Sequence, residues 1–136
     1  NSAVTRWLAP RGLPDLMGRA AKAEFATRYA FTGTLAAAEW APYAPARSAM
    51  VYVEDTTSAA ASWGLRAVDA GANVLLAEPK IDVVFERPLT TNTGLVIAAP
   101  TQVVVDLMTG PGRNPSEAEE LLEWMKRNEQ SWRGPG

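Results

Sequence analysis

The sequence contains no cysteine and no histidine. Without cysteine the chain cannot form disulfides or thiolate metal sites. Without histidine it has no imidazole general base, no Ser-His-Asp triad and no imidazole–zinc site. Any chemistry must therefore come from carboxylates, lysine, tyrosine, serine or threonine. No signal peptide is visible in these residues and no apolar run reaches about 18 residues, so we expect no membrane span and a cytoplasmic location.

The composition is that of an ordinary globular domain. The chain has 136 residues, of which 47% are apolar and 21% charged, enough for one domain with its own core. We expect an N-terminal tail over 1–13, a single domain over 14–132 and a C-terminal tail over 133–136. The chain begins at Asn1 rather than at a methionine, which fits a domain cut from a longer protein.

The net charge of −2 conceals an asymmetry. Residues 1–47 carry six basic and three acidic side chains, a net charge of +3, and the rest of the chain carries seven basic and twelve acidic ones, a net charge of −5. A basic segment can follow a phosphate backbone or meet an acidic partner, although most such segments are solvated surfaces.

Capping and periodicity signals predict five helices. The Val103–Val105 run favours a strand by composition, whereas Pro100 before it and Gly110 after it favour a helix. Thr57 or Ser58 would cap the third helix, and Gly64 would end it in a left-handed conformation with Leu65 folded back on the last turn. The predicted helices begin at Pro14, lie within 32–42 and 56–65, span 100–110, and begin at Pro115 after an Asn114 cap.

Short β-prone runs predict five strands. The clearest is Met50–Val53, and two later runs suggest a hairpin around Ala70–Gly71. "IDVVFE" (81–86) and "GLVIAA" (94–99) supply the last two strands. The fold class is therefore α/β, mixed α+β, with a roughly five-stranded mixed sheet packed with helices. Its core would be nucleotidyltransferase-like or restriction-endonuclease-like, without a confirmed active site.

The stretch "AEPKIDVVFE" (77–86) raises the question of nuclease activity. On a strand Glu78, Lys80 and Asp82 would line one side. In a metal-dependent nuclease Glu78 would hold a divalent ion, Lys80 would assist the attacking water, and Asp69 would complete the metal shell. Pro79 restricts this segment to a sheet edge or strand end. The pattern therefore favours a solvated strand entry, with the nuclease as the alternative.

A nucleotidyltransferase would need two carboxylates at alternating positions of a strand to hold paired metals. The strand that follows the "TGT" turn offers Val51, Tyr52 and Val53 instead. The one acidic pair with this spacing is Glu117/Glu119, which falls on a predicted helix. We therefore expect no catalytic residues, no metal and no cofactor. The five tryptophans are expected to pack in or beside the core.

Several stretches together resemble the C-terminal domain of AbiEi-type antitoxins, the transcriptional regulators of type IV toxin–antitoxin systems. They are "YAFTGTLAAAEWAPYAP", "MVYVED", "GLRAVDAGANVLL", "DVVFE" and "GLVIAAPTQVVVDLMTGPGRNPSEAEELLEWM", which lie between about residues 28 and 126. At the position of the serine that often precedes the proline of the last stretch, this sequence has Ala99.

The resemblance implies a non-catalytic regulatory domain that binds a nucleotidyltransferase-type toxin. DNA would be read by a separate winged-helix domain, which these residues do not contain, and a homo-oligomer is compatible with this role. Any DNA contact made by this domain itself would be to phosphates, from Arg11, Arg19, Lys22 and Arg28.

Overall fold

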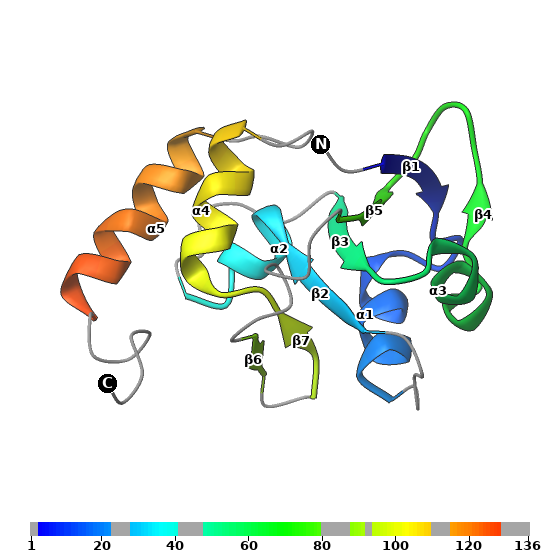
Figure 1. Cartoon of the computed structure of the whole chain (residues 1–136), viewed down its shortest axis with the longest axis horizontal. Helices are drawn as coiled ribbons and strands as arrows, with labels where there is room; N and C mark the ends of the chain where they lie inside the picture. Colours follow the sequence, from blue (N-terminus) through cyan, green and yellow to red (C-terminus); the bar gives the residue numbers. More distant parts are fainter. Residues whose placement is uncertain are drawn as a thin grey trace.

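The computed structural model describes residues 3–22, 28–40, 48–79, 88–91, 94–109 and 115–128. Within these ranges a mixed sheet combines with five helices (Figure 1). The helices are α1 (Leu13–Lys22), α2 (Gly33–Ala37), α3 (Thr56–Trp63), α4 (Pro100–Thr109) and α5 (Pro115–Arg127). The strands are β1 (Ala3–Leu8), β2 (Tyr29–Thr32), β3 (Ala49–Val53), β4 (Arg66–Ala67), β5 (Val74–Glu78), β6 (Leu89–Thr90) and β7 (Val96–Ile97).

The strands lie in the order β4-β1-β5-β3-β2-β7-β6. β3 is central and buried along its whole length, because it is parallel to β5 on one side and antiparallel to β2 on the other. Its continuous run of buried residues matches a strand that is covered on both faces. The mixed α/β class is confirmed, but the sheet has seven described strands rather than five.

The N-terminal prediction is wrong for Ala3–Leu8. This segment is no tail, because it forms β1 between β4 and β5. The hairpin prediction around Ala70–Gly71 is wrong for the same reason, since β1 separates the two strands that were expected to pair. The predicted strand over 81–86 lies outside the described residues.

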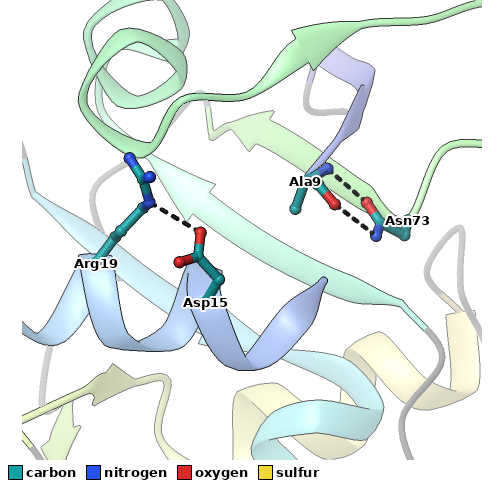
Figure 2. A network of polar contacts seen from close by, with 4 residues as sticks. All are labelled: Ala9, Asp15, Arg19 and Asn73. Atoms are coloured by element: carbon teal, nitrogen blue, oxygen red, sulfur yellow. Dashed lines mark hydrogen bonds and ion pairs between the residues drawn. The ribbon is translucent and has the colours of Figure 1, made fainter. Parts of the chain in front are cut away.

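Asn73 ties this part of the sheet together (Figure 2). Its side chain accepts a hydrogen bond from Ala9 N at 2.8 Å and donates one to Ala9 O at 3.3 Å. Its backbone N–H donates to Trp7 O, and its carbonyl accepts from Ala49 N. A single residue therefore joins the end of β1 and the starts of β3 and β5.

One face of the sheet is covered by α1 and α3. Trp63, fully buried at the end of α3, contacts the rings of Tyr29 and Phe31, and the Tyr29 hydroxyl donates to Ala20 O of α1. Trp7, Trp40 and Trp124 pack partly buried against the same core. The expected packing role is confirmed for these four tryptophans, and Trp132 lies outside the described residues.

The opposite face is covered at one end by α4, with α5 packed beside it (Figure 1). The Val103–Val105 run is helical, as its flanking Pro100 and Gly110 favoured. α5 begins at Pro115 as predicted, while its expected Asn114 cap lies outside the described residues. α2 begins after Thr32, whose side chain makes no cap and binds α4 instead.

α3 ends as its sequence predicts. Gly64 adopts the left-handed conformation (φ 66°), and Leu65 N bonds back to Ala60 O, the pattern of a helix C-terminus. The α3 cap is Asp55 and not Thr57 or Ser58. A Cβ at Gly64 would lie 3.2 Å from an Arg19 guanidinium nitrogen, and Asp15 holds that guanidinium in place (Figure 2).

We expect Gly64→Ala to lower the free energy of unfolding by about 1–2 kcal/mol, because an L side chain is strained at positive φ. Gly18→Ala is the matched control, since nothing lies within 4 Å of its Cβ and alanine favours the interior of α1 by up to about 1 kcal/mol. Urea unfolding measures both. Equal effects of the two substitutions would contradict this account of Gly64.

Candidate functional site

The Glu78 carboxylate binds the start of α3. Glu78 is the last residue of β5, and its Oε2 accepts a hydrogen bond from Thr56 N at 2.8 Å. Asp55 Oδ1 accepts from Ser58 N at 3.2 Å. The two carboxylates together satisfy N–H groups of the first turn, which have no partner within the helix, and they lie at its positive end.

The other two residues of the nuclease hypothesis do not join Glu78. Asp69 is exposed in the loop after β4, and β1 lies between β4 and the strand that carries Glu78. Lys80 and Asp82 lie outside the described residues. In the described ranges no three Asp, Glu, His or Cys side chains are grouped so that they could hold a metal ion.

Two of the four cations considered as phosphate contacts are paired with carboxylates. Arg19 is bonded to Asp15 at 2.8 Å, and Arg28 is bonded to Glu54 at 2.8 Å. Arg11 precedes α1 and Lys22 ends it, so these two exposed side chains lie at opposite ends of one helix. Arg19 lies one turn before Lys22 on the same helix.

The most developed polar cluster is buried between the sheet and α4. Asp106, 6% exposed, accepts from Thr32 Oγ1 at 2.6 Å and from Tyr52 Oη at 2.7 Å. Gln102, one turn earlier on α4, donates to the same carboxylate at 3.1 Å. Hydrogen bonds to a carboxylate are stronger than those between neutral groups, so this cluster fixes α4 to β2 and β3.

Strand geometry explains how these residues meet. Thr32 pairs with Met50 in the β2–β3 register, and Tyr52 lies two residues further along β3. Residues two apart on a strand share a face, so both hydroxyls point to the side where α4 lies. Gly33 then turns the chain into α2 with φ 69°, a conformation that favours glycine.

Burial raises the pKa of Tyr52, and the hydrogen bond and charge of Asp106 raise it further, while the hydrogen bond from Gln102 opposes them. The Tyr52 hydroxyl therefore stays protonated at neutral pH and donates to Asp106. A tyrosine held in this way is not a general base. The arrangement serves to orient α4.

Glu117 is a second acidic residue in a buried position. It lies in the first turn of α5 and is 3% exposed. Burial raises its pKa, and a hydrogen bond with the Thr34 side chain partly offsets this effect. The contact joins the first turn of α5 to the start of α2.

Sequence reasoning missed the Asp106 cluster, although a signal for it was present. Asp106 lies within the apolar run "VVVDLM", where a carboxylate at a core-facing helix position needs partners. Thr32 and Tyr52 lie 74 and 54 residues away from it in the sequence. Those partners became identifiable only once the β2–β3 register was known.

Comparisons with protein-family models, with curated proteins and with solved structures find no match to this chain. None of the helices in the described residues combines the length and apolar character needed to cross a bilayer.

We expect Asp106→Ala to lower the free energy of unfolding by about 3 kcal/mol or more, because it leaves the buried Thr32 and Tyr52 hydroxyls without their acceptor. Thr101→Ala, at an exposed position of the same helix, is the control and should change stability by less than about 0.5 kcal/mol. Denaturant titration followed by circular dichroism measures both. A small loss in Asp106→Ala would mean that the cluster does not hold α4.

Glu117→Gln tests the effect of burying this carboxyl group. Because folding raises the Glu117 pKa above its ordinary value of 4.5, the contribution of this group to stability is full below pH 4.5 and falls as pH rises through the folded-state pKa. The glutamine variant should therefore be more stable than the parent at pH 7 and equal to it near pH 3.5. Chemical unfolding at both values tests this, and a less stable variant at pH 7 would contradict it.

Proposed function

We propose that this chain is a non-catalytic regulatory domain of an antitoxin-like transcriptional regulator. It acts by binding a protein partner of the nucleotidyltransferase-type toxin class, while DNA is read by a separate winged-helix domain. The observation that carries the non-catalytic part is the Glu78 carboxylate, which is bonded to Thr56 N at the start of α3. A carboxylate in this position stabilises a helix terminus, and a metal ion would have to compete for the same oxygen.

The Asp106 cluster supports the same proposal. The strand position where a nucleotidyltransferase would carry metal-binding acids holds Tyr52, whose hydroxyl donates to a carboxylate already engaged by Thr32 and Gln102. A metal ion at Asp106 would displace three hydrogen bonds at a site that is almost completely buried. The described chain therefore uses its best-placed acids to hold elements together.

Cleavage assays and stability measurements together test the non-catalytic part. With Mg²⁺ or Mn²⁺ we expect the protein to leave DNA intact. Glu78→Ala should lower the free energy of unfolding by about 1 kcal/mol, because Thr56 N at the start of α3 loses its acceptor. Asp69→Ala is the matched control, and it should change stability by less than about 0.5 kcal/mol because the side chain is exposed.

The nuclease alternative makes the opposite prediction. Metal-dependent cleavage that disappears in Asp69→Ala, Glu78→Ala and Lys80→Ala would overturn the proposal. Partner binding is tested separately, by calorimetric titration of the full chain with a nucleotidyltransferase-type toxin encoded beside it. A measurable complex is expected, and the absence of binding would contradict the antitoxin role.

A further inference from the structure

Among the described residues, helices cover the face of the sheet that carries α4 at one end only. Thr32 and Tyr52 point to the α4 side, and Met50, which pairs with Thr32, points there too. The parallel β3–β5 register places Leu75 beside Met50, and the antiparallel β1–β5 register places Arg6 opposite Leu75. The α4 side of the sheet therefore continues across β5 and β1 to β4.

The uncovered end carries a mixed apolar and basic surface, here called the open sheet surface. Val4 and Leu8 share it with Arg6 because they alternate along β1, and Arg66 of β4 lies opposite Leu8. Val4 is 39% exposed, Arg6 and Arg66 are exposed, and Leu8 and Leu75 are half-buried. β1, β4 and β5 contain one acidic residue, Glu78. Ala77 pairs with Tyr52 and so points to the α4 side, and Glu78, the next residue along β5, therefore points to the other face.

The α4–α5 pair carries a surface of opposite charge, here called the α4–α5 outer surface. Val105 and Met108, each 52% exposed, lie one turn apart on α4. On α5 the 36%-exposed Leu122 lies among exposed carboxylates, Glu119 and Glu123. Glu123 has a loose contact with Lys126 at 3.7 Å, in which both side chains are mostly exposed and the negative charge remains available.

The exposed large hydrophobic residues of the described chain fall on these two surfaces. They are Val4 on the first and Val105, Met108 and Leu122 on the second. Apolar side chains in an exposed cluster with charged neighbours are typical of interaction sites. One surface is basic and the other acidic, so each has the charge that the other would recognise.

We propose that two copies of this chain associate face to face about a two-fold axis, with the α4–α5 outer surface of each copy on the open sheet surface of the other. Figure 1 shows α4 and α5 at one end of the molecule and β4 at the other, so the two surfaces of one copy cannot meet each other. On the α4 side of the sheet the helices lie over one end, and no described helix lies over β1 and β5 on that side, so the described residues form a step. Two such steps are complementary after a rotation of 180°.

This arrangement closes as a dimer. A two-fold axis makes the two contacts identical, so each pair uses both of its complementary surfaces and leaves none to propagate a filament. Arg6 and Arg66 of one copy would lie near Glu119 and Glu123 of the other, with the four exposed hydrophobic residues between them. The dimer is independent of the toxin partner proposed above.

Charge exchange between the two surfaces tests this contact. The double variant Arg6→Glu/Arg66→Glu makes both surfaces of a copy acidic, and Glu119→Arg/Glu123→Arg makes both basic. Each variant alone should have a dimer dissociation constant at least about tenfold above that of the parent, because attraction becomes repulsion in both contacts. An equimolar mixture of the two variants should restore dimers, since every contact in the heterodimer again joins opposite charges.

Sedimentation equilibrium of the full chain measures these constants, over concentrations up to about 1 mM, where even a weak dimer with a binding free energy of about −4 kcal/mol is populated. The control is Arg11→Glu/Lys22→Glu, which makes the same change in charge at the ends of α1, the helix on the other face. It should leave the constant unchanged. Val105→Ser/Met108→Ser tests the apolar part and should also weaken the dimer.

The result that supports the proposal is a parent dimer that both charge variants weaken and that their mixture restores. A monomer across the whole concentration range would overturn it. So would a dimer that is insensitive to the charge variants, or one that the α1 control weakens equally. If one charge variant fails to fold, by circular dichroism, the serine variant decides, because an unchanged constant there also overturns the proposal.

Discussion

The buried Asp106 carboxylate is the interaction on which the arrangement of the layers depends. The Thr32 and Tyr52 hydroxyls reach it from two neighbouring strands, and Gln102 reaches it from within α4. A carboxylate is costly to bury unless its oxygens accept hydrogen bonds, so α4 has one favourable position on the sheet. Because α5 packs on α4 and is joined to α2 through Glu117 and Thr34, the position of the whole helical end follows from this cluster.

The same constraint places α4 over one end of that face of the sheet. α4 can cover β2 and β3 only if Asp106 lies above Thr32 and Tyr52, and no described helix is placed above β1 and β4 on this side. The acids of the chain are then divided between two uses. Asp55, Glu78 and Asp106 stabilise the fold through hydrogen bonds, while acids on the outside of α5 remain available to a partner.

Features encoded by neighbouring residues could be predicted from the sequence, and features that depend on distant residues could not. Pro100 and Gly110 correctly identified α4 in spite of its valines, and Gly64 correctly identified the end of α3. The β1 strand was missed because its pairing partners lie about 60 to 75 residues away, and its own Pro10–Gly12 neighbourhood resembles a loop. The hairpin error followed from the same omission.

The candidate site shows the same division. The spacing of Glu78 and Lys80 is a local pattern that fits a nuclease. What the Glu78 carboxylate binds depends instead on where α3 begins relative to β5. The close approach of Thr56 to that carboxylate is a tertiary contact across 22 residues of sequence. Acidic residues near a strand end are equally suited to binding a cation and to binding a helix terminus, and only the fold distinguishes the two.

The position of β1 has a consequence for how the chain is made. β1 precedes β4 and β5 in the chain, so it leaves the ribosome before the two strands with which it pairs have been synthesised. Until then its backbone N–H and C=O groups are free to pair with another nascent chain, and β5, on emerging, presents a bare edge of its own. Synthesis therefore passes through a period in which the correct insertion of β1 competes with strand exchange between molecules.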